Sequence, residues 1–281
     1  MDQAAALRDL MKQATSPKPR ILAVTSGKGG VGKSTLTINM ALALAKTGKR
    51  VVILDLDVGF GNIETLVGAN ATYSFADVKS GDVLMKDALV EGPLGVRFLS
   101  GGSGFLEMVR WSEEEIARVH EQFQEMEQHF DVVLLDTGAG MTDIQMSFLV
   151  AADEGILVTT PEPTALTDAY SVLKMIHHHR PDFAFHLVVN QCVSLMEGRQ
   201  TATQFQKVCK EFLQRELQFA GLILKDDEVN RAVKRQYPLL LHAPKSQAAK
   251  SIEKVVYDLV GMPPRPTAGL SGFLRKLVAI R

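Results

Sequence analysis

Short hydrophobic runs separated by amphipathic stretches recur along most of the chain. Six runs are rich in Val, Ile and Leu and almost continuously apolar: RILAVTS from 20, RVVILDLD from 50, DVVLLDT from 131, EGILVTT from 154, AFHLVVN from 184 and FAGLILK from 219. Runs of this kind are typical of parallel strands that helices cover on both faces. The pattern therefore predicts an α/β fold with a doubly wound, mostly parallel sheet.

The stretch between 112 and 130 has the helical period instead. Ser112 and Glu115 fit a capping box, which marks the start of a helix. An apolar stripe follows at Ile116, Val119, Phe123, Met126 and Phe130. This spacing predicts an amphipathic crossover helix that packs its stripe on the sheet.

Breaker-rich segments divide the chain into a central domain and two appendages. The segment TSPKP at 15–19 follows a short helical stretch at 1–14, and GMPPRPTAG at 261–269 precedes a second amphipathic stretch at 270–281. Proline and glycine clusters of this kind read as linkers. We therefore expect a domain over 20–260, with a head helix and a tail helix attached to it.

Composition and charge narrow the class of protein. With 46% hydrophobic and 22% charged residues, the chain is expected to be a soluble globular protein. Cys192 and Cys209 match no disulfide or metal-binding pattern, which favours a reducing cytoplasm. The start shows no secretory signal, and no apolar run reaches the ~18 residues of a membrane span. Residues 231–281 carry ten Lys and Arg against two acids, a balance of +8 that leaves −9 elsewhere. That end should seek an anionic surface, either lipid headgroups or nucleic acid.

The loop TSGKGGVGKST, residues 25–35, contains the phosphate-binding pattern G-x-x-x-x-G-K-[ST] at Gly27, Gly32, Lys33 and Ser34. It follows a predicted strand and opens a predicted helix, which is the context that such a motif requires. Backbone N–H groups and the helix N-terminus would hold the phosphates, with Lys33 on the β- and γ-phosphates and the Ser34 hydroxyl on Mg²⁺. A second lysine, Lys28, has no role in an ordinary phosphate loop.

Carboxylates stand at the ends of two predicted strands. Asp55 and Asp57 end the run from 50, and Asp136 ends the run from 131. Ligands of open α/β sheets bind at the carboxyl ends of the strands, so these acids are placed to reach a metal ion or an attacking water. Together with the loop, they predict a nucleotide-hydrolysing site.

These motifs resemble those of one family. The loop from Lys28 to Ser34, the Asp55-Leu-Asp57 strand end and the DTGAG at 136–140 are similar to the deviant Walker A ATPases of the MinD/ParA class, over nearly the whole chain. The resemblance implies a MinD-like P-loop fold with a sheet of about seven or eight strands. It also implies a homodimer that sandwiches two ATP molecules, in which Lys28 reaches across to the partner's phosphates.

The resemblance assigns a role to each matching residue. The expected catalytic residues are Lys28, Lys33 and Asp57. The expected ligands of ATP or ADP are Gly27, Lys28, Gly29, Gly30, Val31, Gly32, Lys33, Ser34, Thr35 and Asn190, the last of these as the adenine contact. The expected Mg²⁺ residues are Ser34, Asp55 and Asp136. The chain departs from the family pattern at Gln191, where a basic residue is common, and in GLILKDD from 221, where the family usually has a proline.

The head stretch resembles one branch of that family. DQAAALR at 2–8 is similar to the DQAxxLR element of the flagellar MinD-like ATPases, called FlhG, FleN or YlxH. In that branch the element stimulates FlhF, a GTPase of the signal-recognition-particle type, and flagellar C-ring proteins are further partners. The residues expected to contact the GTPase are Asp2, Gln3, Leu7 and Arg8.

The tail stretch at 270–281 has one apolar face and one basic face. Its apolar residues are Leu270, Phe273, Leu274, Leu277 and Val278, and Arg275 and Lys276 lie opposite. Such a helix either packs on its own domain or lies on an anionic membrane. It is similar to the membrane-targeting helix of MinD proteins. A single tail would bind lipid weakly, but two tails on one dimer would bind together.

The sequence thus predicts a slow ATPase that acts as a dimerising switch, cycles between the cytoplasm and the inner face of the cell membrane, and controls flagellar number or placement. Two alternatives stay within the class: a MinD regulator of the division site, and a ParA partition ATPase that grips DNA through its basic end. Apolar residues in the tail favour lipid, so no nucleic-acid partner is expected. Iron proteins that share this loop need cluster-holding cysteines, which Cys192 and Cys209 do not suit.

Overall fold

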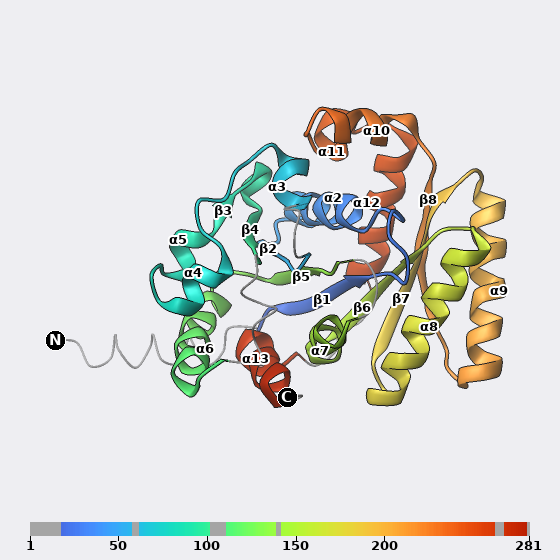
Figure 1. Cartoon of the computed structure of the whole chain (residues 1–281). Helices are drawn as coiled ribbons and strands as arrows, with labels where there is room; N and C mark the ends of the chain where they lie inside the picture. Colours follow the sequence, from blue (N-terminus) through green and yellow to red (C-terminus); the bar gives the residue numbers. More distant parts are fainter. Residues whose placement is uncertain (1–17, 58–61, 102–110, 139–141, 262–266, 280–281) are drawn as a thin grey trace.

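An eight-stranded sheet forms the centre of the computed structural model, which describes residues 18–57, 62–101, 111–138, 142–261 and 267–279. The strand order is β3-β4-β2-β5-β1-β6-β7-β8 (Figure 1). The strands are β1 (Arg20–Thr25), β2 (Val51–Asp55), β3 (Val90–Glu91), β4 (Arg97–Ser100), β5 (Val132–Asp136), β6 (Glu154–Thr159), β7 (Ala184–Cys192) and β8 (Gln218–Leu224). Every described pairing is parallel except β3 with β4. The predicted doubly wound, mostly parallel fold is confirmed.

Helices cover both faces of this sheet. They are α2 (Lys33–Lys46), α3 (Asn62–Val67), α4 (Phe75–Ser80), α5 (Met85–Ala88), α6 (Glu113–Glu127), α7 (Asp143–Ala151), α8 (Pro163–His179), α9 (Leu195–Leu213), α10 (Asp227–Lys234), α11 (Leu239–His242), α12 (Gln247–Gly261) and α13 (Gly269–Ala279), with a 3-10 turn at Pro93–Gly95. In Figure 1, α2, α11 and α12 lie above the sheet, and α6, α7 and α13 lie below it.

The strands are apolar throughout because each face of the sheet meets a separate hydrophobic core. In β1, Ile21 and Ala23 belong to the core between the sheet and α6, α7 and α13. Leu22 and Val24 belong to the core on the other face, between the sheet and α2 and α12. Successive residues of a strand point to opposite faces, so a strand buried on both sides has no polar alternation.

Each of the six predicted strands is present, and two short edge strands were not predicted. β3 has two residues and β4 has four, and they lie together at one edge of the sheet. The predicted crossover helix is α6. Its capping box forms as expected, with Ser112 Oγ accepting from Glu115 N and Glu115 Oε2 accepting from Ser112 N.

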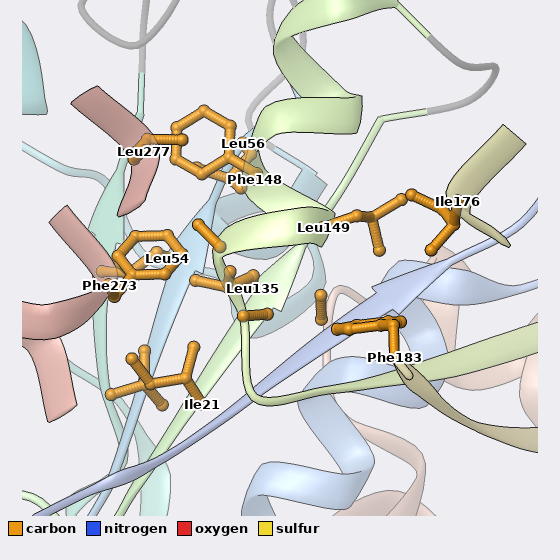
Figure 2. Packing of buried hydrophobic residues seen from close by; sticks show 14 of the residues in the cluster. Ile21, Leu54, Leu56, Leu135, Phe148, Leu149, Ile176, Phe183, Phe273 and Leu277 are labelled. Atoms are coloured by element: carbon orange, nitrogen blue, oxygen red, sulfur yellow. The ribbon is translucent and has the colours of Figure 1, made fainter. Parts of the chain in front are cut away.

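The tail helix α13 packs on the body of the domain, against α6, α7 and β1. Leu270, Phe273, Leu274 and Leu277 are each at most 4% exposed. The ring of Phe273 lies 6.0 Å from that of Phe148 on α7. Figure 2 shows Phe273 and Leu277 facing Phe148 within the shared core. The apolar face that the sequence predicts for membrane binding is therefore covered by protein in this structure, while Arg275 is exposed and Lys276 is half-buried.

Polar contacts fix the start of the tail helix. Glu127 Oε1 at the end of α6 accepts from Ser271 N at 2.6 Å. Lys18 Nζ donates to Ala268 O at 3.2 Å, and Thr267 Oγ1 donates to Pro19 O at 2.8 Å. The helix thus begins beside the residues that lead into β1. Within the described part of the chain, no helix is long and apolar enough to cross a bilayer.

Several predicted segments lie outside the described residues. These are the head helix of 1–14, with Asp2, Gln3, Leu7 and Arg8, part of the linker at 15–19, and residues 262–266 of the linker at 261–269. The domain boundaries and the roles of both appendages stay predictions.

Candidate nucleotide-binding site

The phosphate loop connects β1 to α2 at the carboxyl edge of the sheet. Gly30 and Gly32 have φ values of 77° and 95°, which are strained for any residue with a side chain. A Cβ on Gly27 would stand 2.2 Å from the carbonyl carbon of Asp168 in α8. Gly29 and Gly30 are exposed. The glycines therefore allow a tight loop that packs against α8 and leaves backbone N–H groups open to a phosphate.

Lys33 is the buried cation of the loop. Its side chain is at the first turn of α2, and Nζ donates to Ser26 Oγ at 3.0 Å. Burial lowers the pKa of Lys33, and the nearby carboxylates of Asp136 and Asp57 oppose that shift. A cation held among acids in a low-dielectric site is suited to bind a polyanion such as a nucleotide phosphate.

The side chain of Lys28 reaches residues at the start of α8. Nζ lies 2.8 Å from Glu162 Oε2 and 3.0 Å from Thr164 Oγ1, both at the start of α8. The side chain of Lys28 is 39% exposed and that of Glu162 is 63% exposed. The lysine lowers the pKa of Glu162 through a hydrogen bond and its charge. Exposed pairs of this kind contribute about 0–1 kcal/mol, so Lys28 can leave Glu162 at little cost.

Asp55 and Asp136 stand side by side at the carboxyl ends of β2 and β5, where they are register partners. Both are buried. Burial, followed by the charge of Asp136, raises the pKa of Asp55 to about 7. Burial raises the pKa of Asp136 to about 6, against the opposing effect of hydrogen bonds from Ser34 and Thr37. Two neighbouring buried carboxyls with raised pKa values are suited to bind a cation, which would displace protons.

The oxygen atoms near Asp136 fit Mg²⁺. Thr37 Oγ1 donates to Asp136 Oδ1 at 2.9 Å, whereas Oδ2 is buried without a hydrogen-bond partner within the described residues. The Ser34 hydroxyl lies close enough to the same carboxyl to lower its pKa. The described residues form no group of three or more His, Cys, Asp or Glu that could hold a metal by themselves. Mg²⁺ usually takes only one or two carboxylates and completes its shell with water and phosphate oxygens, so this donor set suits it.

Asp57 lies beside the end of β5. A Cβ on Gly138 would approach Asp57 Oδ1 to 2.9 Å and Gln145 Nε2 to 2.7 Å, so both side chains border this glycine. The charge of Asp57 also acts on Lys33. The three acids predicted from the strand ends are therefore brought together beside the phosphate loop.

A cavity next to the loop is placed to receive a base. It has a volume of about 130 Å³ and is lined by Gly32, Thr35, Leu36, Asn190, Gln191, Ile223, Leu224, Lys225, Asp226, Val229, Asn230 and Ile252. The predicted residues Thr35 and Asn190 thus lie together. Asn190 donates to Val31 O at 2.7 Å and accepts from Gln191 N at 2.8 Å. A carboxamide has two N–H groups and two lone pairs, so Asn190 retains one of each, enough for N6 and N7 of adenine.

Sequence reasoning missed several of these neighbours. Glu162 follows the end of β6, and the rule that strand ends line the crevice could have identified it. Lys225 and Asp226 follow the end of β8 in the same way. Thr37 had no sequence signal, because its role depends on the contact between α2 and β5.

The two cysteines do not suit an iron cluster. Cys192 and Cys209 are both buried. Burial raises the pKa of each thiol to about 11. Within the described residues, neither thiol belongs to a group of three or more His, Cys, Asp or Glu that could hold a metal ion.

Comparison with known proteins agrees with this geometry. A ParA family model, described as "NUBPL iron-transfer P-loop NTPase", matches residues 18–260. The chain is 25% identical to a chain of the MinC:MinD cell division protein complex of Aquifex aeolicus, with a TM-score of 0.69 over 89% of this chain and 99% of that one. The chain belongs to the ParA/MinD family of P-loop ATPases.

Its similarity to characterised relatives identifies the branch. It is 37% identical to the antiactivator FleN of Pseudomonas aeruginosa over 95% of this chain and 97% of the relative. It is 32% identical to the flagellum site-determining protein YlxH of Helicobacter pylori over 92% and 90%. Within the family, the chain falls in the FlhG/FleN/YlxH branch, as the head motif predicted.

Proposed function

We propose that this ATPase is a nucleotide-controlled homodimer that regulates the number or placement of flagella. The observation that carries the proposal is the position of Lys28. Lys33 already supplies the cation of its own loop, while Lys28 is held at the surface by Glu162 and Thr164. A lysine so placed is available to the phosphates of a second copy, and this would make dimerisation depend on bound ATP.

Each part of the site has a defined task in ATP hydrolysis. The N–H groups of residues 29–34 and Lys33 bind the phosphates, and Asn190 orients the adenine. Ser34 and Asp136, with Asp55 beside them, would hold Mg²⁺, which would neutralise phosphate charge. Asp57 orients the attacking water, and Lys28 of the second copy stabilises the charge that develops on the transferred phosphate.

The flagellar role rests on the relatives FleN and YlxH, whose names describe an antiactivator and a flagellum site-determining protein. The head motif at residues 2–8 would bind the GTPase FlhF, and flagellar C-ring proteins would be further partners. The tail α13 would leave its site on α6 and α7 and bind anionic lipid at the cytoplasmic face of the membrane. Two tails on one dimer would bind far more tightly than one.

Light scattering with a non-hydrolysable ATP analogue tests the central claim. The wild-type protein should double its mass when the analogue is added, and Lys28→Ala should stay monomeric. Lys46→Ala is a matched control, because Lys46 forms a similarly exposed pair with Glu253 at 2.8 Å, away from the loop. It should dimerise like the wild type. A Lys28→Ala protein that dimerises normally would refute the role of Lys28 across the dimer.

A pull-down tests the predicted partner. Protein with and without residues 1–14 would be used to capture purified FlhF in the presence of GTP. Recovery only with the full chain supports the proposed contact through Gln3 and Arg8. Equal recovery by both proteins would show that the head motif is not the binding element.

A further inference from the structure

Two neighbouring carboxamides at the end of β7 donate hydrogen bonds to the phosphate loop. Asn190 Nδ2 donates to Val31 O at 2.7 Å, and Gln191 Nε2 donates to Gly30 O at 3.1 Å. The two residues are also linked to each other, because Gln191 N donates to Asn190 Oδ1 at 2.8 Å. Two consecutive carbonyls of the loop are therefore held by two consecutive residues of a strand distant in sequence.

Gln191 has an unusual backbone conformation for this contact. Its φ is 58°, in the left-handed region that residues other than glycine seldom occupy. The pairing of β7 with β8 changes register between Val189 and Cys192, across this residue. Irregularities of this kind redirect side chains, and strained residues concentrate at functional sites. Here the side chain of Gln191 reaches the carbonyl of Gly30.

We propose that Gln191 is a positioning residue of the phosphate loop, which fixes the orientation of the peptide between Gly30 and Val31. In a trans peptide the C=O and N–H groups point in opposite directions. A carbonyl of Gly30 held on the β7 side therefore directs the N–H of Val31 away from β7. Asn190 acts in the same way on the N–H of Gly32, through the carbonyl of Val31. Backbone N–H groups of such loops are the ligands of phosphate, so these two hydrogen bonds orient them for binding.

This role rests on the proposed binding of nucleotide at the loop, and it differs from contact with the base. Gln191 also lines the cavity assigned to the base. A residue that contacts adenine would affect every ligand that carries the base. A residue that orients the loop affects only ligands that carry phosphate, and it leaves adenosine binding unchanged.

Equilibrium binding of ADP and of adenosine, measured by displacement of a fluorescent nucleotide, separates these roles. Gln191→Ala and Gln191→Gly both remove the donor to Gly30 O, but only glycine is relaxed at a positive φ. Both variants should weaken ADP binding about two- to tenfold, the effect of losing one net hydrogen bond. Adenosine affinity should stay within about twofold of the wild type, because adenosine carries no phosphate for the loop to bind. Gln206→Ala is the matched control, because Gln206 Nε2 donates to Leu217 O at 2.6 Å far from the loop. It should leave both affinities unchanged.

Other outcomes overturn the proposal in distinguishable ways. Equal weakening of ADP and adenosine would make Gln191 a base contact. Weakening in Gln191→Ala with recovery in Gln191→Gly would show that only backbone strain matters. Unchanged ADP affinity in both variants would remove the role altogether. A wild-type protein that binds neither ligand would refute nucleotide binding at this loop, and with it this proposal.

Discussion

Replacing Glu127 by alanine should loosen the tail helix without altering either of its faces. Glu127 belongs to α6, and its Oε1 accepts from Ser271 N at 2.6 Å in the first turn of α13. This carboxylate satisfies one of the N–H groups that a helix start leaves unpaired, and it lies at the positive end of the helix dipole. Glu127→Ala removes both effects and leaves Phe273 and the other apolar residues in place.

The free energy by which Glu127→Ala should weaken docking of the tail helix follows from that single contact. A hydrogen bond to a charged group contributes about 1.5–3 kcal/mol, and a charge at a helix terminus about 0.3–1 kcal/mol. Glu127 is only half-buried, so solvent screening brings the sum to about 1–2 kcal/mol. The undocked population of the tail should therefore increase roughly 5- to 30-fold.

Hydrogen exchange measured by mass spectrometry reads this population directly. Peptides covering 270–279 should exchange faster in Glu127→Ala by about the same factor, while peptides from β1 and β5 keep their rates. Binding to anionic vesicles without nucleotide should increase in parallel. Glu125→Ala is the matched control: it removes the same charge from an exposed position on the same helix.

Two results would refute this reasoning. Unchanged exchange of 270–279 in Glu127→Ala would show that Glu127 does not hold the tail. Faster exchange without greater vesicle binding would show that docking does not limit access to lipid, and it would count against the membrane role of α13.

Three further substitutions test the site, and a fourth, Asp131→Asn, lies outside it and serves as a comparison. Asp57→Ala should trap the ATP-bound dimer, seen as a doubled mass with ATP and almost no phosphate release; rapid turnover would exclude Asp57 as the residue that orients water. Asp136 has a pKa raised to about 6, so it holds its proton more tightly when folded, and its contribution to stability falls as the pH rises from about 4 to 6. Asp136→Asn should therefore stabilise the nucleotide-free protein at pH 8 by up to about 3 kcal/mol, with the gain lost below pH ~4. Arg50 lowers the pKa of Asp131, so Asp131→Asn should instead destabilise the protein at neutral pH. If Asp136→Asn and Asp131→Asn changed the free energy of unfolding in the same direction in urea titrations, the opposite pKa shifts of the two carboxyls would be contradicted. Gly27→Ala places a Cβ 2.2 Å from the backbone of Asp168 and should abolish ADP binding in a calorimeter; unaltered binding would show that the loop and α8 can separate.

The fold was predictable where burial imposes a pattern. β1, β2 and β5 are covered on both faces, so their residues had to be apolar without alternation. β3 and β4 escaped prediction because they have two and four residues and lie at the edge of the sheet. Strands so short and only partly buried carry too few residues to show a period.

The site was predictable only as far as its chemistry is local in sequence. The loop glycines and Lys33 follow from a motif, and Asp55 and Asp136 from the rule on strand ends. The partner of Lys28 did not follow, because Glu162 reaches it only when α8 packs beside the loop. The tail shows a different limit: an apolar stripe such as that of α13 fits a protein groove and a lipid surface equally well, and periodicity alone does not choose between them.

Helix α7 offers a physical route between the nucleotide and the tail. Near its start, Gln145 borders Gly138 beside Asp57, where the attacking water would be held. One turn later, Phe148 packs on Phe273 of the tail (Figure 2). A nine-residue helix moves as a unit, so a shift at Gln145 when ATP binds would also displace Phe148. Packed aromatic side chains tolerate only small shifts before their contacts are lost, so the same movement would weaken the site that covers the tail. On this route ATP would favour both the dimer and the release of its two tail helices. A distance measured between labels on α7 and α13 should then increase when ATP analogue is added.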